Sequence, residues 1–367
     1  MKDFKCFNLS VVGASHLEKN TVMQDSSASF KDEKMALAIV SDGHGSKHYF
    51  RSDKGSALAV EAAEECMKEF VSSVTADEVL CENNEAIFVQ LEKSIIARWN
   101  SLVHRHYSEN PFTEEELELS GKYREDYLNG LDFVQAYGAT LIAVAVTEKY
   151  WFGLHIGDGI CVAIYEDGNV KEPIPWDEKC HLNVCTSICD KDASKEFRYF
   201  CNEKIPVAVY VGSDGIDDSF GRDYSAEKSE LLYNFYRLIS LTFAKDEFEQ
   251  TRNNLKDYLS QLSEMGSRDD VSVAGIFNLN GLEASKEWLE IHQEAVKKKR
   301  LVKSLENELE KAEKEENEEA KEKADSLRES IDAASSEYEA LCEKLDEILK
   351  TSDNAVSSQT EAHEIKE

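Results

Sequence analysis

Two short stretches of the sequence place an aspartate and a glycine directly after an apolar run. Residues 35–40 are all apolar, and they are followed closely by Asp42, Gly43 and His44. Residues 207–215 repeat the arrangement and end in the same Ser-Asp-Gly order. A divalent metal ion can bind to a carboxylate and to a backbone carbonyl that is left accessible by glycine, and a neighbouring imidazole can donate a proton. A single Asp-Gly pair is usually a polar turn, but two pairs at the ends of two buried strands favour a functional site.

Carboxylates recur at the predicted strand ends and turns, at Asp25, Asp42, Asp158, Asp214 and Asp269. If these side chains converge without Lys or Arg partners, they repel one another and resist ionisation. Bound cations remove that cost, and oxygen ligands with few protein contacts per ion suit Mg²⁺ or Mn²⁺. Two such ions about 3.5–4 Å apart would bridge and activate a water molecule and hold a phosphoryl group for in-line displacement. The pattern therefore predicts hydrolysis of a phosphate ester.

The elements that must position these residues can be predicted from the spacing of apolar residues. Tight links between successive strands indicate antiparallel pairing, and helices in blocks favour α+β layers over a doubly wound sheet. Residues 14–20 are predicted to be a polar loop and residues 108–136 a surface connection or short helices. We expect strands at 7–13, 35–40, 138–147, 150–157, 160–166, 205–213 and 271–277, and helices at 52–72, at 84–104 and between 224 and 264.

The composition changes abruptly at Gly281. Residues 283–350 contain no Gly or Pro, and apolar residues spaced alternately by three and four from Ala324 to Ile348 predict a heptad seam. The seam needs a partner helix, which is residues 301–312 folded back, a second copy of the chain or another protein. We therefore expect a phosphatase domain at 1–280, a helical coiled coil or hairpin at 283–350, and a disordered acidic tail at 351–367.

The composition of the chain limits its possible binding partners and its cellular compartment. A net charge of −31 argues against nucleic acid or an anionic membrane as a partner. No long apolar run or signal peptide is recognised, so a cytoplasmic protein is expected. The nine cysteines are predicted to be reduced, mostly buried thiols. The spacing of structural zinc sites, two ligand pairs with short gaps, is not found in the cluster of Cys180, His181, Cys185 and Cys189. Zinc binding is therefore the less favoured interpretation of this cluster, and buried thiols are the favoured one.

Six motifs occur in an order that resembles one known family. They are Gln24-Asp25, Ser41-Asp42-Gly43-His44-Gly45, Gly138-Ala139-Thr140, Gly157-Asp158, Ser213-Asp214-Gly215, and residues 266–273 around Asp269. This set resembles the protein phosphatase 2C family of metal-dependent, PPM-type serine/threonine phosphatases, and the first motif resembles its bacterial branch. The resemblance implies a four-layer α-β-β-α sandwich of two antiparallel sheets, with metal ions in a cleft at one end.

The resemblance also implies roles for individual residues. Asp42 would bridge two Mn²⁺ or Mg²⁺ ions, with the carbonyl of Gly43 beside it. Asp214 and Asp269 would hold the first ion, Asp25 would ligate or order water near the pair, and Asp158 would help to bind a third, weaker ion. His44 would be the general acid that protonates the departing seryl or threonyl oxygen, so that His44 and Asp42 are the expected catalytic residues.

This sequence departs from the family pattern at three positions. The arginine that the family uses to bind phosphate is replaced by Asn20, so Lys19 or His16 is expected to take its place. Gln24 stands where an acidic residue is usual, and Asp270 stands where Asn is common.

The expected function is hydrolysis of phosphoserine and phosphothreonine in proteins by a metal-bridging water or hydroxide, with no covalent intermediate. Two alternatives stay open. One is a catalytically idle phosphatase fold that acts as a scaffold through its helical tail, by self-association or with a partner protein. The other is a two-metal hydrolase of small phosphate esters.

Overall fold

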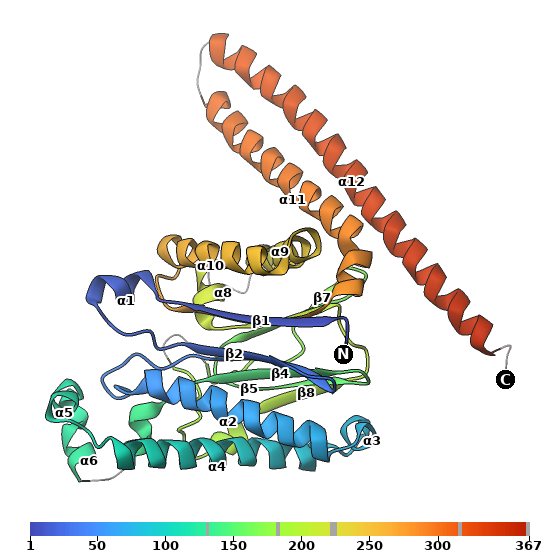
Figure 1. The fold of residues 1–367 in the computed structure, drawn as a ribbon. Coiled ribbons are helices and arrows are strands. Elements are labelled where there is room, and N and C mark those ends of the chain that lie inside the picture. The colour runs from blue at the N-terminus through green and yellow to red at the C-terminus, as the bar shows by residue number, and fades with distance from the viewer. Residues whose placement is uncertain (130–131, 181–183, 221–225, 315–317, 365–367) are drawn as a thin grey trace. The chain divides into compact units, whose positions relative to one another are not determined.

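Two antiparallel sheets of five strands each form the centre of the computed structural model, which describes residues 1–129, 132–180, 184–220, 226–314 and 318–364. Figure 1 shows the sheets stacked face to face with helices on both outer sides. The α+β sandwich predicted from the sequence is therefore confirmed. Contacts within the chain divide it into two units, residues 1–165 with 170–282, and residues 166–169 with 283–367.

The first sheet joins the two ends of the larger unit. Its first strand, β1, hydrogen bonds to β10 over eight residues, from Phe4 opposite Asn278 to Val11 opposite Val271. The sheet order is β1 (Phe4–Val11), β10 (Val271–Asn278), β9 (Ala208–Gly212), β6 (Ile160–Ile164) and β7 (Val170–Lys171).

The second sheet contains the most apolar strands. All seven residues of β3 and all seven of β4 are buried, as expected for central strands that are covered on both faces. The sheet order is β2 (Ser26–Lys31), β3 (Met35–Ser41), β4 (Leu141–Thr147), β5 (Trp151–Ile156) and β8 (Arg198–Asn202).

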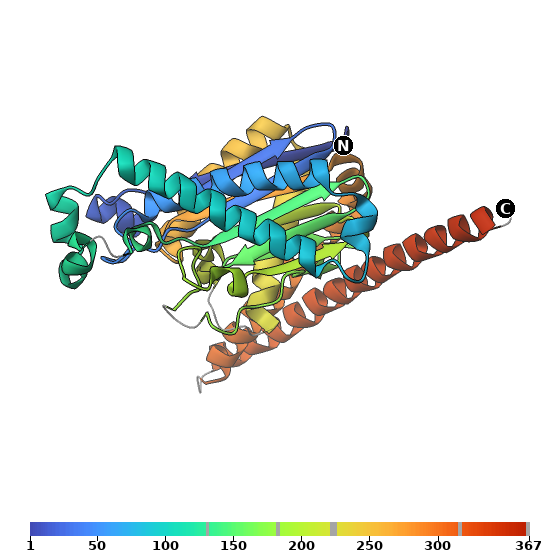
Figure 2. The ribbon, with the colours of Figure 1, turned by 90° about the horizontal axis from the view of Figure 1, so that it is seen from below.

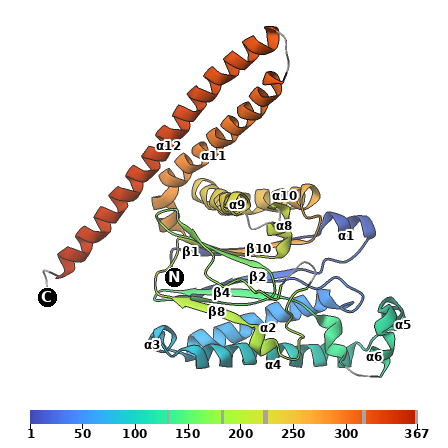
Figure 3. The ribbon, with the colours of Figure 1, turned by 180° about the vertical axis from the view of Figure 1, so that it is seen from behind.

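Helices cover the outer face of each sheet. In Figures 2 and 3, α2 (Ser52–Ser73) and α4 (Glu85–Glu109) lie along the second sheet, and α8 (Asp214–Phe220), α9 (Ala226–Lys245) and α10 (Phe248–Met265) lie along the first. Three apolar clusters result, one under each helical layer and one between the sheets. The cluster between the sheets contains small residues such as Ala36, Ala38 and Ala274.

Short helices occupy the segments that the sequence left irregular. The segment predicted as a polar loop is instead α1 (Ala14–Lys19), because Asn20 adopts a left-handed conformation (φ 53°) and its N–H caps the helix end. The surface connection contains α5 (Glu114–Leu119) and α6 (Arg124–Leu128), and the prediction of short helices there is confirmed. Two further short α-helices in the described residues are α3 (Ala76–Leu80) and α7 (Ala193–Glu196), and short 3-10 helices lie at Gly121–Tyr123 and Phe133–Tyr137.

The smaller unit contains two long helices, α11 (Leu279–Glu313) and α12 (Glu318–Glu364). Leu305, Leu309 and Ala312 pack against Ala324 and Leu327. Ion pairs join Arg328 to Glu313 at 2.6 Å and Lys344 to Glu287 at 3.7 Å, so the helices run antiparallel. Of the three partners considered for the seam, the structure thus places the folded-back segment against it.

The last helix extends into the segment for which the sequence predicts a disordered acidic tail. The helix α12 continues to Glu364, and no Gly or Pro after Lys350 interrupts it. Residues 365–367 lie outside the described residues. None of the helices that the structure describes is both long and apolar enough to cross a membrane.

Candidate functional site

Eight of the nine residues predicted for the site line a single cleft of about 650 Å³ at one end of the two sheets. The ninth, Asp25, does not line the cleft but lies buried, with 5% of its surface exposed. The cleft therefore gathers side chains from the ends of both sheets. The eight are His16, Lys19, Asp42, Gly43, His44, Asp158, Asp214 and Asp269.

The turn after β3 is fixed by the beginning of β4. The Asp42 carbonyl accepts a hydrogen bond from Thr140 N at 2.7 Å, and Asp42 N donates to Thr140 Oγ1 at 3.0 Å. Ser41 Oγ donates to the Thr140 carbonyl at 2.5 Å. A Cβ on Gly43 would lie only 2.6 Å from the Ser52 carbonyl oxygen, so this position requires glycine. The Gly-Ala-Thr motif of the sequence thus acts as a support for Asp42.

The turn after β9 is held in the same way by β10. Ser213 N donates to the Ser272 carbonyl at 3.0 Å, and Ser272 N donates to Ser213 Oγ at 3.0 Å. A Cβ on Gly215 would lie 2.0 Å from the Asp270 carbonyl oxygen, which leaves room only for glycine. Asp214 is thereby placed at the first position of α8, at the rim of the cleft.

Asp270 has a structural role that the sequence analysis missed. Its side chain is 3% exposed, and its carboxylate accepts hydrogen bonds from Gly13 N at 2.7 Å and Gln24 N at 2.6 Å. The same carboxylate lies 3.0 Å from His16 Nδ1. Although burial alone would raise the pKa of Asp270, these hydrogen bonds lower it below the usual value. Asp270 therefore ties the segment before β2 to the turn before β10.

Three carboxylates of the site, those of Asp25, Asp42 and Asp269, resist ionisation. Burial, followed by the negative charge of Asp270, raises the pKa of Asp25 to about 8. Burial and then the charges of Asp25 and Asp214 raise the pKa of Asp42 well above its usual value. Burial also raises the pKa of Asp269. The sequence argument that convergent carboxylates would repel one another thus has a direct counterpart in the structure.

The donors present fit a hard divalent cation. Asp25 Oδ2 is buried and has no hydrogen-bond partner, a costly arrangement that a cation would relieve. The carboxylates and the Gly43 carbonyl supply oxygen ligands, which Mg²⁺ and Mn²⁺ prefer. Among the residues that the structure describes, no group of three or more His, Cys, Asp or Glu already stands close enough to hold an ion.

His44 lies in the cleft as a neutral imidazole. Burial lowers its pKa to about 4, and the charge of Asp214 opposes this effect. Its Nε2 atom is buried without a hydrogen-bond partner, and its ring packs 4.9 Å from the ring of Tyr49. The imidazole thus packs against an aromatic ring, and its Nε2 atom has no hydrogen-bond partner in the protein.

The two residues predicted to bind phosphate differ in their surroundings. The side chain of His16 is 13% exposed, and hydrogen bonding to Asp270 raises its pKa although burial opposes the shift. His16 therefore has a protein partner already. Lys19 ends α1 and is exposed at the cleft. Tyr49 and Asp218 also line the cleft, and no motif in the sequence had pointed to them. Cys185, which the sequence analysis considered only as a zinc ligand, lines the cleft as well.

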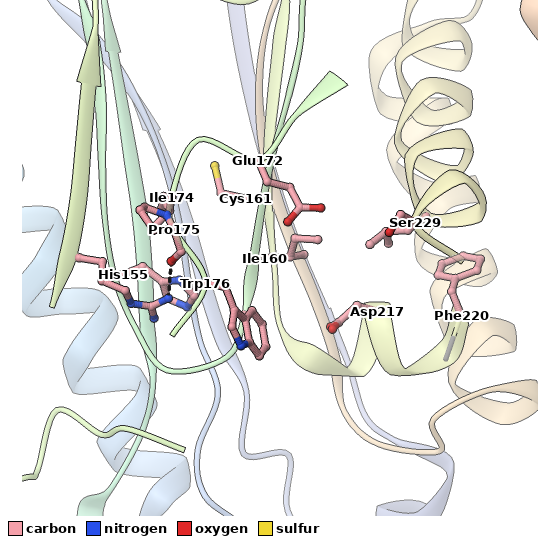
Figure 4. Close-up of a pocket in the computed structure, with 13 residues that line it drawn as sticks. His155, Ile160, Cys161, Glu172, Ile174, Pro175, Trp176, Asp217, Phe220 and Ser229 are labelled. Atoms are coloured by element: carbon pink, nitrogen blue, oxygen red, sulfur yellow. Dashed lines mark hydrogen bonds between the residues drawn. The ribbon is translucent and has the colours of Figure 1, made fainter. Parts of the chain in front are cut away.

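A second, smaller pocket of about 70 Å³ borders Gly159, the residue after Asp158 (Figure 4). Arg198, on β8, spans this region: it donates to the Pro175 carbonyl at 2.7 Å and to the Gly157 carbonyl at 2.6 Å. These hydrogen bonds fix the turn that carries Asp158 from behind. His181, considered above as a zinc ligand, lies outside the described residues.

Comparisons with known proteins complete the description. The family model for protein phosphatase 2C matches residues 12–260, more than half of the chain. A crystal structure of a bacterial serine phosphatase is 15% identical, with a TM-score of 0.45, over 75% of this chain and 98% of that chain. Stp1, a serine/threonine phosphatase from Staphylococcus aureus, is 15% identical, with a TM-score of 0.44, over 75% of this chain and 94% of its own. No curated protein matches the sequence.

Proposed function

Because this chain belongs to the protein phosphatase 2C family, we propose that it is a metal-dependent phosphatase of phosphoserine and phosphothreonine in proteins. The observation that carries the proposal is the gathering of five aspartates at the ends of both sheets. Four of them line one cleft, and the fifth, Asp25, is buried with an unpartnered oxygen. Carboxylates that only closed a turn would gain from a cationic or hydrogen-bonding partner, whereas this oxygen has neither.

Asp42, Asp214 and Asp269, with Asp25 behind them and the Gly43 carbonyl beside them, would hold two Mn²⁺ or Mg²⁺ ions. Asp158 would help Asp214 to hold a third. Bound ions supply charge that neutralises the phosphoryl oxygens and lowers the pKa of a water molecule. Hydrolysis adds water across the P–O bond and releases inorganic phosphate and the seryl or threonyl hydroxyl, with no covalent bond to the protein.

His44 supplies the proton that the leaving oxygen needs. Its Nε2 atom is free of protein partners and belongs to a residue that lines the cleft. Because burial lowers its pKa to about 4, His44 is mostly neutral without substrate. The negative charge of a bound phosphate would raise this pKa, so that the imidazole is charged when the P–O bond breaks. Lys19, exposed at the end of α1, contributes a positive charge for the phosphate, and His16 lies beside it.

The test is turnover by the purified full-length chain with and without Mn²⁺, on p-nitrophenyl phosphate and on a phosphothreonine peptide. We expect Mn²⁺-dependent release of phosphate from both, with a higher kcat/KM on the peptide. Asp257 of α10 is exposed and lies outside the cleft, so Asp257→Asn is a matched control for Asp42→Asn.

The outcome separates the three candidate functions. If neither substrate is hydrolysed at saturating Mn²⁺, the catalytically idle scaffold is the candidate function that remains. Hydrolysis of the small ester with no turnover of phosphopeptides would leave the small-ester hydrolase. Equal activity of Asp42→Asn and Asp257→Asn would show that the cleft is not the catalytic site.

Two further parts of the proposal concern the rest of the chain. The seam of residues 283–350 is proposed to act as a coiled coil that binds a second copy or a partner protein, in addition to the pairing of α11 with α12. The cytoplasm is the proposed location, because an odd number of cysteines favours a reducing compartment. Cell fractionation tests the location, and light scattering tests the self-association.

A further inference from the structure

Two cysteine sulfurs are in contact at the wall of the cleft. Sγ of Cys180 lies 3.9 Å from Sγ of Cys185. The side chain of Cys180 is 5% exposed, whereas Cys185 is partly exposed and lines the same cleft as Asp158 and Asp214. A disulfide needs the two sulfurs about 2 Å apart, so a shift of roughly 2 Å separates the dithiol from the bonded state.

The pair is connected to the turn that carries Asp158. The Cys185 thiol donates to the carbonyl of Thr186, with Sγ 3.3 Å from the oxygen. The next residue, Thr186, accepts a hydrogen bond from Gly157 N at 3.0 Å and donates to Asp177 Oδ2 at 2.8 Å, both through Oγ1. A movement of Cys185 therefore reaches the Gly157-Asp158 turn through Thr186.

The other buried thiol of this segment has different surroundings. Sγ of Cys189 lies 3.2 Å from Ser187 Oγ and 3.4 Å from Gln135 Oε1. In the part of the chain that the structure describes, Cys180 and Cys185 are the thiols whose sulfurs touch. Hydrogen bonding from Cys185 also lowers the pKa of the Cys180 thiol, which favours the nucleophilic thiolate there.

We infer that Cys180 and Cys185 form a reversible oxidation site at the cleft, which a hydroperoxide converts into a disulfide that lowers phosphatase turnover. The effect on turnover rests on the function proposed above, whereas formation of the disulfide does not. The site would couple the phosphatase to peroxide in a compartment where thiols are otherwise reduced.

The reaction balances with the hydroperoxide as the oxidant. One sulfur attacks a peroxide oxygen, so that an S–O bond forms, the O–O bond breaks, and the other oxygen leaves as water or an alcohol. The second sulfur then attacks the resulting sulfenic sulfur, the S–S bond forms, and the S–O bond breaks with release of water. Both thiol protons end on the departing oxygens. A dithiol reductant reverses the change by thiol–disulfide exchange.

The disulfide removes the S–H group that donates to the Thr186 carbonyl and draws Cys185 toward Cys180, which disturbs the contact of Thr186 with Gly157, the residue before Asp158. Loss of such an outer contact to a metal-binding residue typically lowers metal affinity or activity about 10–100-fold. The oxidised chain should therefore need more Mn²⁺ and turn over substrate more slowly.

The first test is mass spectrometry of the full-length chain after treatment with hydrogen peroxide, alkylation and trypsin. Cleavage after Lys179 and Lys191 gives one peptide that contains Cys180, Cys185 and Cys189. We expect this peptide to lose two hydrogen atoms, to carry its single alkyl group on Cys189, and to return to three alkylated thiols after dithiothreitol. A disulfide that includes Cys189, or sulfinic acid without a disulfide, would overturn the assignment.

The second test is turnover on p-nitrophenyl phosphate at several Mn²⁺ concentrations. Peroxide should lower turnover of the wild type and of Cys189→Ala, with recovery in dithiothreitol, and Cys180→Ala should lose this reversible response. A disulfide that forms without any change in turnover or Mn²⁺ requirement would refute the link to Asp158. If the reduced chain has no phosphatase activity, the proposed function fails, and the mass spectrum still decides whether the disulfide forms.

Discussion

Replacement of Asp270 by Asn, the residue common in the family at this position, should destabilise this chain. The carboxylate accepts one N–H group on each oxygen, from Gly13 at 2.7 Å and from Gln24 at 2.6 Å. An asparagine side chain has a single acceptor oxygen, so one of these N–H groups would face an NH₂ group. A hydrogen bond to a charged group contributes about 1.5–3 kcal/mol. With the added loss of the charge beside His16, we expect the free energy of unfolding to fall by about 2–4 kcal/mol.

The pH dependence follows from two opposite shifts. The pKa of Asp270 is lowered from 3.8, so its stabilising effect is present above pH 3.8 and is lost as the pH falls through the folded-state value. The pKa of His16 is raised from 6.5, so its effect is complete below pH 6.5 and is lost as the pH rises through the folded-state value. The difference between wild type and Asp270→Asn should thus be largest between these two limits.

Urea unfolding at pH 6 in the presence of a chelator, followed by tryptophan fluorescence, measures the effect. Asp257→Asn is the control, and as a surface substitution it should stay within about 0.5 kcal/mol of the wild type. If Asp270→Asn also stays within about 0.5 kcal/mol, the two backbone hydrogen bonds do not stabilise the fold as argued.

Three further predictions concern catalysis and the helical unit. Asp42→Asn should retain less than about a tenth of wild-type turnover at saturating Mn²⁺, and a higher turnover would exclude a bridging role for Asp42. The metal-free form of this variant should be at least as stable as the metal-free wild type, because the substitution removes a carboxylate with a raised pKa. His44→Ala should lower turnover on a phosphothreonine peptide about 10²–10⁴-fold. The loss should be much smaller on p-nitrophenyl phosphate, because its leaving group hardly needs a proton. Equal losses on the two substrates would mean that His44 is not the general acid. A chain that ends at Leu282 should stay folded and hydrolyse small esters. Light scattering on the full-length and the truncated chain shows whether the truncation converts a dimer into a monomer. An insoluble truncated chain would mean that α11 is part of the phosphatase core.

Much of the fold could be predicted because its central strands are fully apolar. The run from Met35 to Val40 became β3 almost residue for residue. The strand β8 was missed, since Arg198–Asn202 is a partly buried edge strand whose pattern contains no apolar run. The helix α1 was missed for a related reason: none of its six residues is buried, and its end depends on the left-handed Asn20.

A site residue could be predicted where a characteristic residue follows it in the sequence. It could not be predicted where its role depends only on contacts that form in the folded chain. Asp42 and Asp214 stand out because a glycine follows a strand end, and the structure brings both to one cleft. Asp270 could not be separated from an exposed aspartate, because its role depends on N–H groups of Gly13 and Gln24 that are more than 240 residues away. Cys185 reaches the cleft through the tertiary fold alone.

The pairing of β1 with β10 has a consequence for how the protein is made. The strand β1 leaves the ribosome long before its hydrogen-bonding partner at Val271–Asn278. At about 5–20 residues per second, β1 waits roughly 15–50 s for that partner to be synthesised. During this time Asp269 does not yet exist beside Asp42, and the edge of β1 is open to other chains or to a chaperone. Each nascent molecule therefore stays without an assembled cleft until β10 has been synthesised, and a premature stop before β10 yields an inactive chain with an unpaired strand.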